Sequence, residues 1–180
     1  KDNSIKTVFK QKNSGKGSAI IKGLDYTKGN YIIIQDADLE YNPEDYRKLI
    51  KPILNQEYEV VYGSRVLGKN RYFVKNFSSV YRIFFNHILT ILSNLINRQK
   101  LTDAHTCYKT FSFKVFNSVN LEEDGFSFCP EITTKLSLMN IEIKEIPIEY
   151  YGRSYKQGKK IKLSDGIKAL VTLFKYRYIK

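Results

Sequence analysis

The sequence predicts an α/β protein with a mostly parallel central sheet covered by helices. Three stretches carry this prediction: a short expected strand at 5–9, apolar residues at helical spacing between 19 and 24, and a continuous apolar run at 31–34. A short continuous run of β-branched residues is typical of a strand buried on both faces, as in a parallel sheet. A strand, a Gly-rich turn, a helix and another strand form one βαβ unit, so we expect the sheet to begin here.

The rest of the chain continues the alternation of helices and strands. Asn42 is a suitable helix cap with Pro43 in the first turn, and the apolar stripe of that helix reaches residue 54. The other expected elements are a strand at 58–62, a long apolar helix at 78–97, a helix starting at Pro130, a strand at 141–148 and a last helix capped by Ser164.

Length and composition describe one ordinary domain, residues 1–180. The 42% hydrophobic and 27% charged residues are typical of a globular protein and exclude a disordered or membrane-embedded chain. Lysine and arginine number 30 against 18 acidic residues, which gives a formal net charge of +12. This excess favours anionic partners such as phosphates, nucleic acid or an anionic membrane surface.

The cysteines and the chain start bear on where the protein works. Cys107 and Cys129 have no CxxC spacing, which argues against a zinc site and favours reduced thiols in a cytoplasmic protein. No signal peptide is visible. Because the chain starts without Met and part-way into an α/β pattern, we expect that an N-terminal portion precedes it.

The helix at 78–97 has an uncharged stretch that is too short for a membrane span. This stretch, 83–97, has 15 residues, whereas a spanning helix needs ~20 predominantly apolar ones. A core helix is the favoured interpretation. The flanking Arg82, Arg98 and Lys100 leave open a helix that lies at a membrane interface.

Three acids spaced two apart follow the apolar run at 31–34: Asp36, Asp38 and Glu40. Strand side chains alternate between faces, so an extended chain would point all three the same way. Gathered carboxylates repel one another unless a cation or a proton relieves them, which predicts a divalent-metal site at the end of the strand. A solvated acidic turn is the alternative.

Two cations are placed to meet a phosphate near these acids. Lys16 lies in a Gly-rich turn that does not match a Walker A loop, with Ser18 as the expected cap of the next helix. Arg65 follows the strand at 58–62, where it could clamp a diphosphate through two hydrogen bonds. The alternatives are a plain helix start for Lys16 and a surface ion pair for Arg65.

Two further carboxylates are open to interpretation. Asp103, beside Thr102 and His105, either orients a substrate or caps a turn. Glu131, in the first turn of the helix expected from Pro130, suits the helix dipole without any further role.

Taken in order, the motifs resemble the family 2 glycosyltransferases of GT-A fold, especially the branch of dolichyl-phosphate mannose synthase and bacterial polyprenyl-phosphate glycosyltransferases. Each motif alone is weak, but their common order over most of the chain is specific. They are Asn13-x-Gly15-Lys16-Gly17, Asp36-Ala37-Asp38-Leu39-Glu40, Gly63-Ser64-Arg65, Asp103-x-x-Thr106-x-Tyr108-Lys109, Phe128-Cys129-Pro130-Glu131, Glu145-Ile146-Pro147-Ile148, and Arg153 with Gly158-Lys159-Lys160.

The resemblance implies a Rossmann-like three-layer α/β/α sandwich without its N-terminal strand. Residues 1–180 would be a single catalytic domain that lacks the N-terminal part binding the nucleotide base. In this family the Asp-x-Asp motif holds Mg²⁺ or Mn²⁺ against the donor diphosphate. The implied metal ligands are therefore Asp36, Asp38 and Glu40, with Asp38 the principal one.

The resemblance also implies roles for the other candidate residues. The donor-binding residues would be Lys16, Asp36, Asp38 and Arg65, and the acceptor phosphate would meet Arg153, Lys159 and Lys160. Relatives have the pattern Arg-x-x-Gly-x-Ser-Lys in the acceptor region, and the spacing is longer here. The implied catalytic residues are Asp38 and Arg65, with Asp103 and Glu131 as base candidates.

The implied reaction is an inverting transfer of a hexose from a UDP- or GDP-sugar to a polyprenyl or dolichyl phosphate. A phosphate acceptor is already ionised, whereas a sugar-hydroxyl acceptor, the alternative, would need a base. The implied location is the cytoplasm, peripheral at the cytoplasmic face of the membrane. An inactive scaffold and a nucleic-acid-binding domain are the remaining alternatives, and the acidic stretch at 36–45 argues against nucleic acid.

Overall fold

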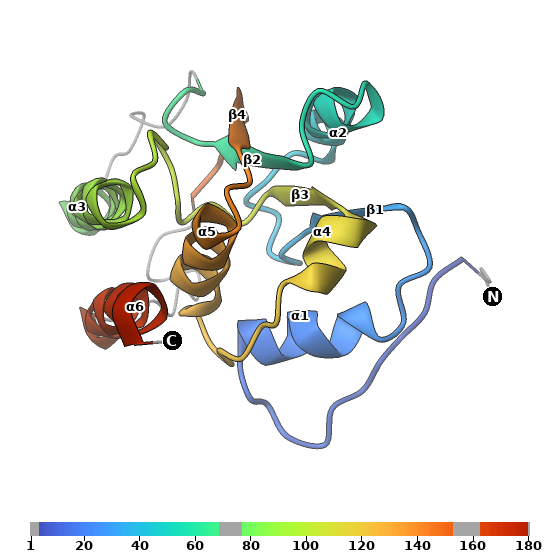
Figure 1. The fold of residues 1–180 in the computed structure, drawn as a ribbon, viewed down its shortest axis with the longest axis horizontal. Coiled ribbons are helices and arrows are strands. Elements are labelled where there is room, and N and C mark those ends of the chain that lie inside the picture. Colours follow the sequence, from blue (N-terminus) through green and yellow to red (C-terminus); the bar gives the residue numbers. More distant parts are fainter. Residues whose placement is uncertain (1–3, 69–76, 153–162, 180) are drawn as a thin grey trace.

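The computed structural model describes residues 4–68, 77–152 and 163–179 as an α/β protein (Figure 1). A four-stranded sheet lies between helices. The elements are α1 (Lys16–Leu24), β1 (Tyr31–Ile34), the 3₁₀ turn η1 (Pro43–Asp45), α2 (Tyr46–Leu54), β2 (Val60–Ser64), α3 (Phe77–Asn97), β3 (Lys109–Ser112), α4 (Phe113–Ser118), α5 (Phe128–Leu138), β4 (Ile143–Pro147), α6 (Leu163–Phe174) and the π-helical turn η3 (Lys175–Ile179).

The sheet has the strand order β1-β3-β2-β4. Strand β3 is antiparallel to both β1 and β2, and β2 is parallel to β4. Three of the four strands therefore run in one direction, as the predicted sheet requires, but two of the three neighbouring pairs are antiparallel, so the sheet is mixed. Ile34, Lys109, Tyr62 and Glu145 pair in one row across all four strands. Strands β1, β2 and β4 thus end, and β3 begins, at one edge of the sheet, which we name the carboxyl edge.

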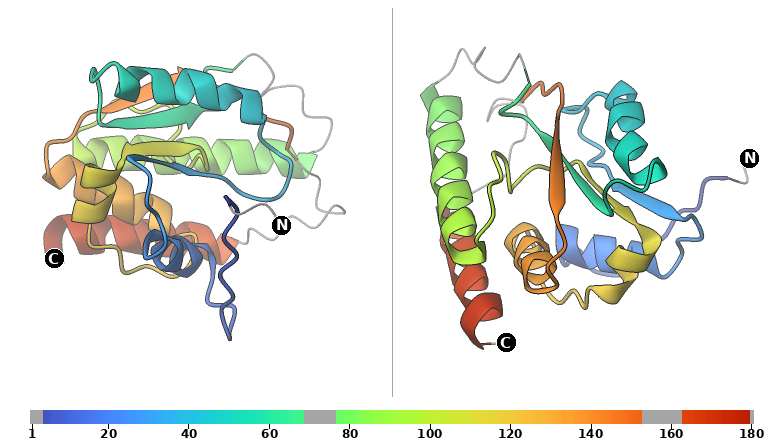
Figure 2. Two further views of the ribbon diagram at one scale, coloured as in Figure 1. Left: turned by 90° about the vertical axis from the view of Figure 1, so that its right-hand side faces the viewer. Right: turned by 45° about the horizontal axis from the view of Figure 1, so that its top comes forward.

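Helices lie on both sides of the sheet and give the expected three layers. Helix α2 covers one face, while α1, α4 and α5 lie on the other (Figure 2). Helices α3 and α6 stand side by side next to α5, at the side of the molecule (Figure 1). Asn42 caps η1 as predicted, because its side-chain oxygen accepts a hydrogen bond from the Glu44 amide at 3.1 Å.

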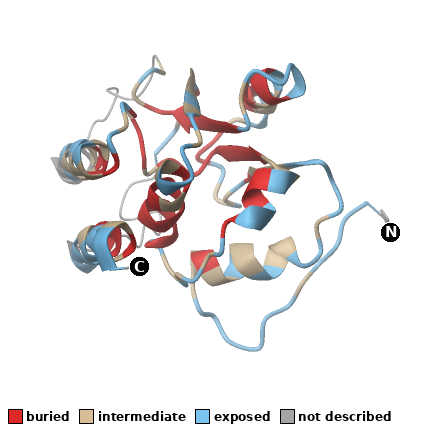
Figure 3. Ribbon diagram, viewed as in Figure 1, coloured by how far each residue is buried: buried red, intermediate tan, exposed pale blue. Residues whose placement is uncertain are grey.

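The core lies on the central strands and the helix faces turned toward them (Figure 3). Strand β2 is buried along its whole length. The continuous apolar run of β1 predicted burial on both faces, but β1 lies at the edge of the sheet and only Ile34 in it is buried. On the covering helices, Leu49 of α2 and Ile132 and Leu136 of α5 are fully buried. Each such side chain stabilises the fold by about 1.5–3 kcal/mol.

Residues 5–9, expected to form a strand, are irregular, and this prediction is wrong. Ile5 and Phe9 are 72% and 89% exposed. No described residue pairs with the outer side of β1, so the segment has no neighbouring strand with which to share backbone hydrogen bonds. An apolar alternation forms a strand only where such a partner exists.

Several helices begin earlier than the sequence suggested, among them α6, which already includes its expected cap Ser164. Helix α1 starts at Lys16 with Gly15 as its cap, not at Ser18, because Gly15 adopts a positive φ of 98° that favours glycine. Helix α5 starts at Phe128, which places Pro130 inside its first turn.

Candidate active site

Lys16 and Asp36 meet at the carboxyl edge, just beyond the end of β1. The Lys16 Nζ lies 2.8 Å from both oxygens of the Asp36 carboxylate. Their side chains are 17% and 31% exposed, so the pair can be reached from solvent. The same ammonium donates to Cys107 Sγ at 3.2 Å.

The charges at this pair are set by burial and by the neighbouring groups. Burial lowers the pKa of Lys16, whereas the negative charge and the hydrogen bond of Asp36 raise it, and the net shift is upward. Burial raises the pKa of the Cys107 thiol to about 12. The site therefore holds a charged ammonium beside a neutral thiol near pH 7.

The acids after Asp36 do not keep the alternation of a strand. Leu39 adopts a φ of 58°, and the Glu40 amide turns back to donate to Asp38 Oδ1 at 3.2 Å. The Glu40 side chain is buried and accepts a hydrogen bond from the Tyr150 hydroxyl at 2.8 Å. The expectation that all three acids share one direction is wrong, because the regular strand ends at Ile34.

The described acids do not form a closed metal cage. In the stretches 4–68, 77–152 and 163–179, no group of three or more His, Cys, Asp or Glu side chains is arranged to hold a metal ion. Asp36 and Asp38 are both half-exposed. One or two carboxylates that solvent can reach suffice for Mg²⁺ and similar ions, which usually complete their coordination with water and substrate phosphates.

Arg65 and Asp103 form a buried, two-point ion pair beyond the end of β2. Arg65 Nε and Nη2 donate to the two carboxylate oxygens of Asp103 at 2.7 and 2.8 Å, and the Arg65 amide adds a third hydrogen bond at 3.1 Å. Burial lowers the pKa of Arg65, but Asp103 outweighs it and raises the pKa above its usual value. The Arg65 guanidinium also lies 5.1 Å from the centre of the Tyr150 ring.

Glu145 of β4 fixes the segment that carries Asp103. Its carboxylate accepts hydrogen bonds from the amides of Thr102 and Asp103 at 2.7 and 2.8 Å. Burial raises the pKa of Glu145, and these amide hydrogen bonds oppose the rise. Asp103 thus orients Arg65, and Glu145 in turn fixes the backbone of Asp103.

Glu131 is completely buried in the first turn of α5. It accepts hydrogen bonds from the amides of Glu122 and Glu123 at 2.7 and 2.9 Å, and from Lys135 Nζ at 2.7 Å. The carboxylate is therefore occupied by protein donors and has no exposed surface.

Sequence reasoning quoted two further groups, Lys109 and His105, as neighbours of Asp103 but gave them no role. Lys109 is fully buried and donates to the carbonyls of Ala104 and Thr106 at 3.0 and 2.8 Å, and burial lowers its pKa. His105 has a buried Nε2 without a hydrogen-bond partner, and burial lowers its pKa to about 4. A lysine at the start of an otherwise uncharged strand was the signal for the first, whereas His105 carries no such signal.

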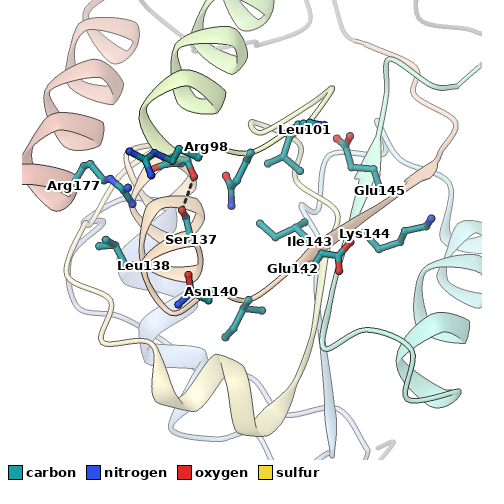
Figure 4. A pocket seen from close by; sticks show the side chains of 14 residues that line it. Arg98, Leu101, Ser137, Leu138, Asn140, Glu142, Ile143, Lys144, Glu145 and Arg177 are labelled. Carbon is teal, nitrogen blue, oxygen red and sulfur yellow. Dashed lines mark hydrogen bonds between the residues drawn. The ribbon is translucent and has the colours of Figure 1, made fainter.

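The three acceptor-phosphate candidates, Arg153, Lys159 and Lys160, lie outside the described residues. A pocket of about 850 Å³ opens instead where β4 begins, among the ends of α3 and α5 and with Arg98 and Arg177 on one side (Figure 4). None of the predicted site residues lines it. Glu145, which holds the Asp103 segment, does line it, so the pocket adjoins the carboxyl edge from behind Asp103.

Known proteins resemble this chain in both sequence and fold. The model of the family "Glycosyl transferase family 2" matches residues 1–119. The chain is 28% identical over 166 residues to an uncharacterised protein of Methanocaldococcus jannaschii, covering 89% of this chain and 67% of that protein. It is 29% identical over 168 residues to the UDP-N-acetylglucosamine–dolichyl-phosphate N-acetylglucosaminyltransferase of Methanococcus voltae, covering 91% of this chain and 66% of that enzyme.

Solved structures with the same fold include glucosyl-3-phosphoglycerate synthase of Mycobacterium tuberculosis. Its crystal structure matches with a TM-score of 0.67 at 15% identity, over 92% of this chain and 56% of that one. The complex of the same enzyme with Mn²⁺, UDP-glucose and glycerol 3-phosphate matches with a TM-score of 0.60 at 16% identity, over 91% and 55%. At such low identity the likeness shows the fold, which is GT-A.

The chain spans between about one third and two thirds of the curated relatives that it matches. Among the residues that the structure describes, no helix combines the length and apolar character needed to cross a membrane. Since the family model covers 119 of the 180 residues and the fold is GT-A, the chain belongs to glycosyltransferase family 2.

Proposed function

We propose that this chain is part of a metal-dependent, inverting glycosyltransferase that moves a hexose from a UDP- or GDP-sugar to a polyprenyl or dolichyl phosphate. One observation carries the proposal. The carboxyl edge brings together Asp36 with Lys16, Asp38 on the following turn, and Arg65 held by Asp103. Open α/β sheets bind their ligands at this edge, and these groups suit a diphosphate with a divalent cation.

The donor diphosphate would be anchored by the half-exposed carboxylates of Asp36 and Asp38. They would hold Mg²⁺ or Mn²⁺, and the bound ion would stabilise the charge that grows on the leaving diphosphate. Lys16 adds a fixed positive charge beside Asp36. The complexes of the structurally similar synthase with Mn²⁺ and UDP-glucose support this assignment.

Glu40 is proposed to position Asp38 without coordinating the metal itself. Its carboxylate is buried and accepts the Tyr150 hydroxyl, while its amide donates to Asp38 Oδ1. These contacts let Glu40 fix the turn that presents Asp38. This role takes the place of the direct coordination that the resemblance implied.

The acceptor is proposed to be a lipid phosphate because the base candidates are occupied. Asp103 is bound to Arg65, and Glu131 is fully buried against two backbone amides. A sugar hydroxyl would need a base within hydrogen-bond reach, whereas an ionised phosphate needs cations. Arg65 and the proposed acceptor residues Arg153, Lys159 and Lys160 would supply them. The similarity to a dolichyl-phosphate glycosyltransferase supports the same acceptor.

The protein is proposed to work at the cytoplasmic face of a membrane, which it would meet with α3 and α6. These neighbouring helices expose apolar side chains at helical spacing, with basic residues close by. Such stripes fit the interfacial region of an anionic bilayer. The exposed apolar residues are Phe84, Phe85, Ile91 and Leu95 on α3 and Ile167, Val171 and Phe174 on α6.

Sugar transfer by the full-length protein tests the proposal. UDP- and GDP-hexoses would be offered with Mn²⁺ and either a polyprenyl phosphate, a matching polyprenyl alcohol or an oligosaccharide. Transfer to the phosphate alone is the expected result. Transfer to the oligosaccharide would mean that the acceptor is a glycan and not a lipid phosphate. If the protein neither transfers the sugar nor hydrolyses the donor, the proposed function is contradicted.

A further inference from the structure

Helix α1 rests with its first turn on the backbone of residues 122–125, and Glu131 holds that backbone in place. We propose that Glu131 is a positioning residue, which acts through this segment to fix Lys16 at the donor site. The inference rests on the proposed function for the identity of the ligand. The contacts that carry it lie within the described residues.

The first contact joins α1 to the segment. The amides of Gly17 and Ser18 donate to the carbonyls of Gly125 and Asp124 at 3.3 and 2.9 Å. The first amides of a helix have no partner within the helix, so these two carbonyls complete the start of α1. The helix start therefore depends on where residues 124 and 125 lie.

The glycines on either side of Lys16 allow this close approach. A Cβ on Gly17 would lie 1.9 Å from the Glu123 carbonyl oxygen, and one on Gly15 would lie 2.6 Å from the Asp124 carbonyl oxygen. No side chain fits at those distances. Since Lys16 lies between two backbone contacts, a shift of the segment would move the Lys16 backbone with it.

Glu131 fixes the segment from the side of α5. Its carboxylate accepts the amides of Glu122 and Glu123, two consecutive donors, at 2.7 and 2.9 Å. Hydrogen bonds to an ionised acceptor are about twice as strong as neutral ones. Lys135 balances the charge from one turn further along α5, at 2.7 Å.

The C-terminal turn η3 closes the segment from another side. Lys175 Nζ lies 2.8 Å from the Glu123 carboxylate, and the Tyr176 hydroxyl donates to the same carboxylate at 3.1 Å. The centre of the Tyr176 ring also lies 4.3 Å from Lys135 Nζ. Glu131 is thus connected to the start of α1 through the backbone of residues 122–125.

The first test is hydrogen exchange, which does not depend on any ligand. In the substitution Glu131→Gln, one of the two amides would face an NH₂ group instead of an acceptor. We expect exchange of the Gly17 and Ser18 amides to accelerate at least about tenfold, while the amides of β2 stay protected. The matched control is Glu142→Gln, which changes an exposed glutamate outside the site. Unchanged exchange at Gly17 and Ser18 in Glu131→Gln would overturn the proposal.

The second test is a double-mutant cycle on nucleotide affinity. Titration with UDP or GDP in the presence of Mn²⁺ should show about tenfold weaker binding in Glu131→Gln, but less than twofold weakening when Lys16→Ala is already present. A merely structural role would weaken both backgrounds by the same factor and contradict the inference. If the unsubstituted protein binds neither nucleotide, the proposed function fails, and hydrogen exchange alone decides on Glu131.

A second variant covers the case in which Glu131→Gln does not fold. Gly17→Ala pushes the segment away from the side of α1 without touching Glu131. It should show the same weakening of nucleotide binding and the same dependence on Lys16. Normal affinity in a folded Gly17→Ala protein would count against the coupling.

Discussion

Arg65 and Asp103 bind each other through two parallel hydrogen bonds of 2.7 and 2.8 Å, with both side chains buried beyond the end of β2. The pair fixes the orientation of the guanidinium at the carboxyl edge. In the site that we propose, a guanidinium oriented in this way would need no rearrangement to meet a bound phosphate, while Asp103 offsets part of its charge. The ion pair would thus make the proposed site prearranged.

Removal of one partner of this ion pair should be costly. Asp103→Asn leaves the Arg65 charge buried without its counter-ion, so we expect a loss of about 3–5 kcal/mol in the free energy of unfolding, measured with urea. Asp25→Asn is the control, because Asp25 pairs with Lys22 on the surface and such pairs contribute about 0–1 kcal/mol. Equal losses of unfolding free energy in the two variants would show that the buried pair contributes no more to stability than the surface pair.

Two lysines of α1 should differ in their effect on donor binding. Lys16→Ala removes the ammonium beside Asp36, and we expect binding of UDP or GDP with Mn²⁺ to weaken about tenfold, in line with the loss of one charged hydrogen bond. Lys22→Ala changes the net charge equally but lies in an exposed pair with Asp25. Isothermal titration of both variants should show a change for Lys16 only, and a similar loss in both would mean that net charge alone matters.

His105 should make the protein sensitive to mild acid. Burial, with Lys109 as the next cause, lowers its pKa from 6.5 to about 4, so the folded protein prefers the neutral ring. Below pH 6.5 the unfolded chain takes up a proton that the folded chain refuses, and stability therefore falls between pH 6.5 and 4, by up to ~3 kcal/mol. Urea unfolding across this range should show a smaller fall for His105→Asn. Parallel curves for the two proteins would contradict this role.

The apolar stripe on α3 and α6 should control membrane binding. Leu95→Glu combined with Val171→Glu places two charges on this face, and we expect co-sedimentation with vesicles of anionic lipid to fall at least about tenfold. Leu54→Glu on α2 is the control, because Leu54 is similarly exposed but lies on the far side of the sheet. If all three proteins bind vesicles equally, another surface makes the contact.

Elements that depend on local sequence could be predicted from the chain. The apolar runs of β1 and β2 and the Asn42 cap express patterns within a few residues, and all three are confirmed. Residues 5–9 have the same kind of pattern but remain irregular, because a strand also needs a partner. Local pattern therefore predicted the element type only where tertiary partners were available.

The contacts within the site depend on tertiary partners, so the sequence did not predict them. Arg65 and Asp103 lie 38 residues apart, and Tyr150 reaches Glu40 across 110 residues. Each contact depends on which strands become neighbours, which the spacing of the motifs does not specify. The dipole argument for Glu131 correctly placed it in a first helical turn, but its two amide partners come from another segment.

The central claim is that Asp38 and Asp36 hold a divalent cation against a donor diphosphate. The most direct measurement is titration of the full-length protein with a UDP- or GDP-hexose, with Mn²⁺ and with EDTA. We expect Mn²⁺-dependent binding that Asp38→Asn weakens at least about a hundredfold while the thermal midpoint without ligand stays within a few degrees. Equal binding with and without Mn²⁺, or unchanged affinity in Asp38→Asn, would contradict the account.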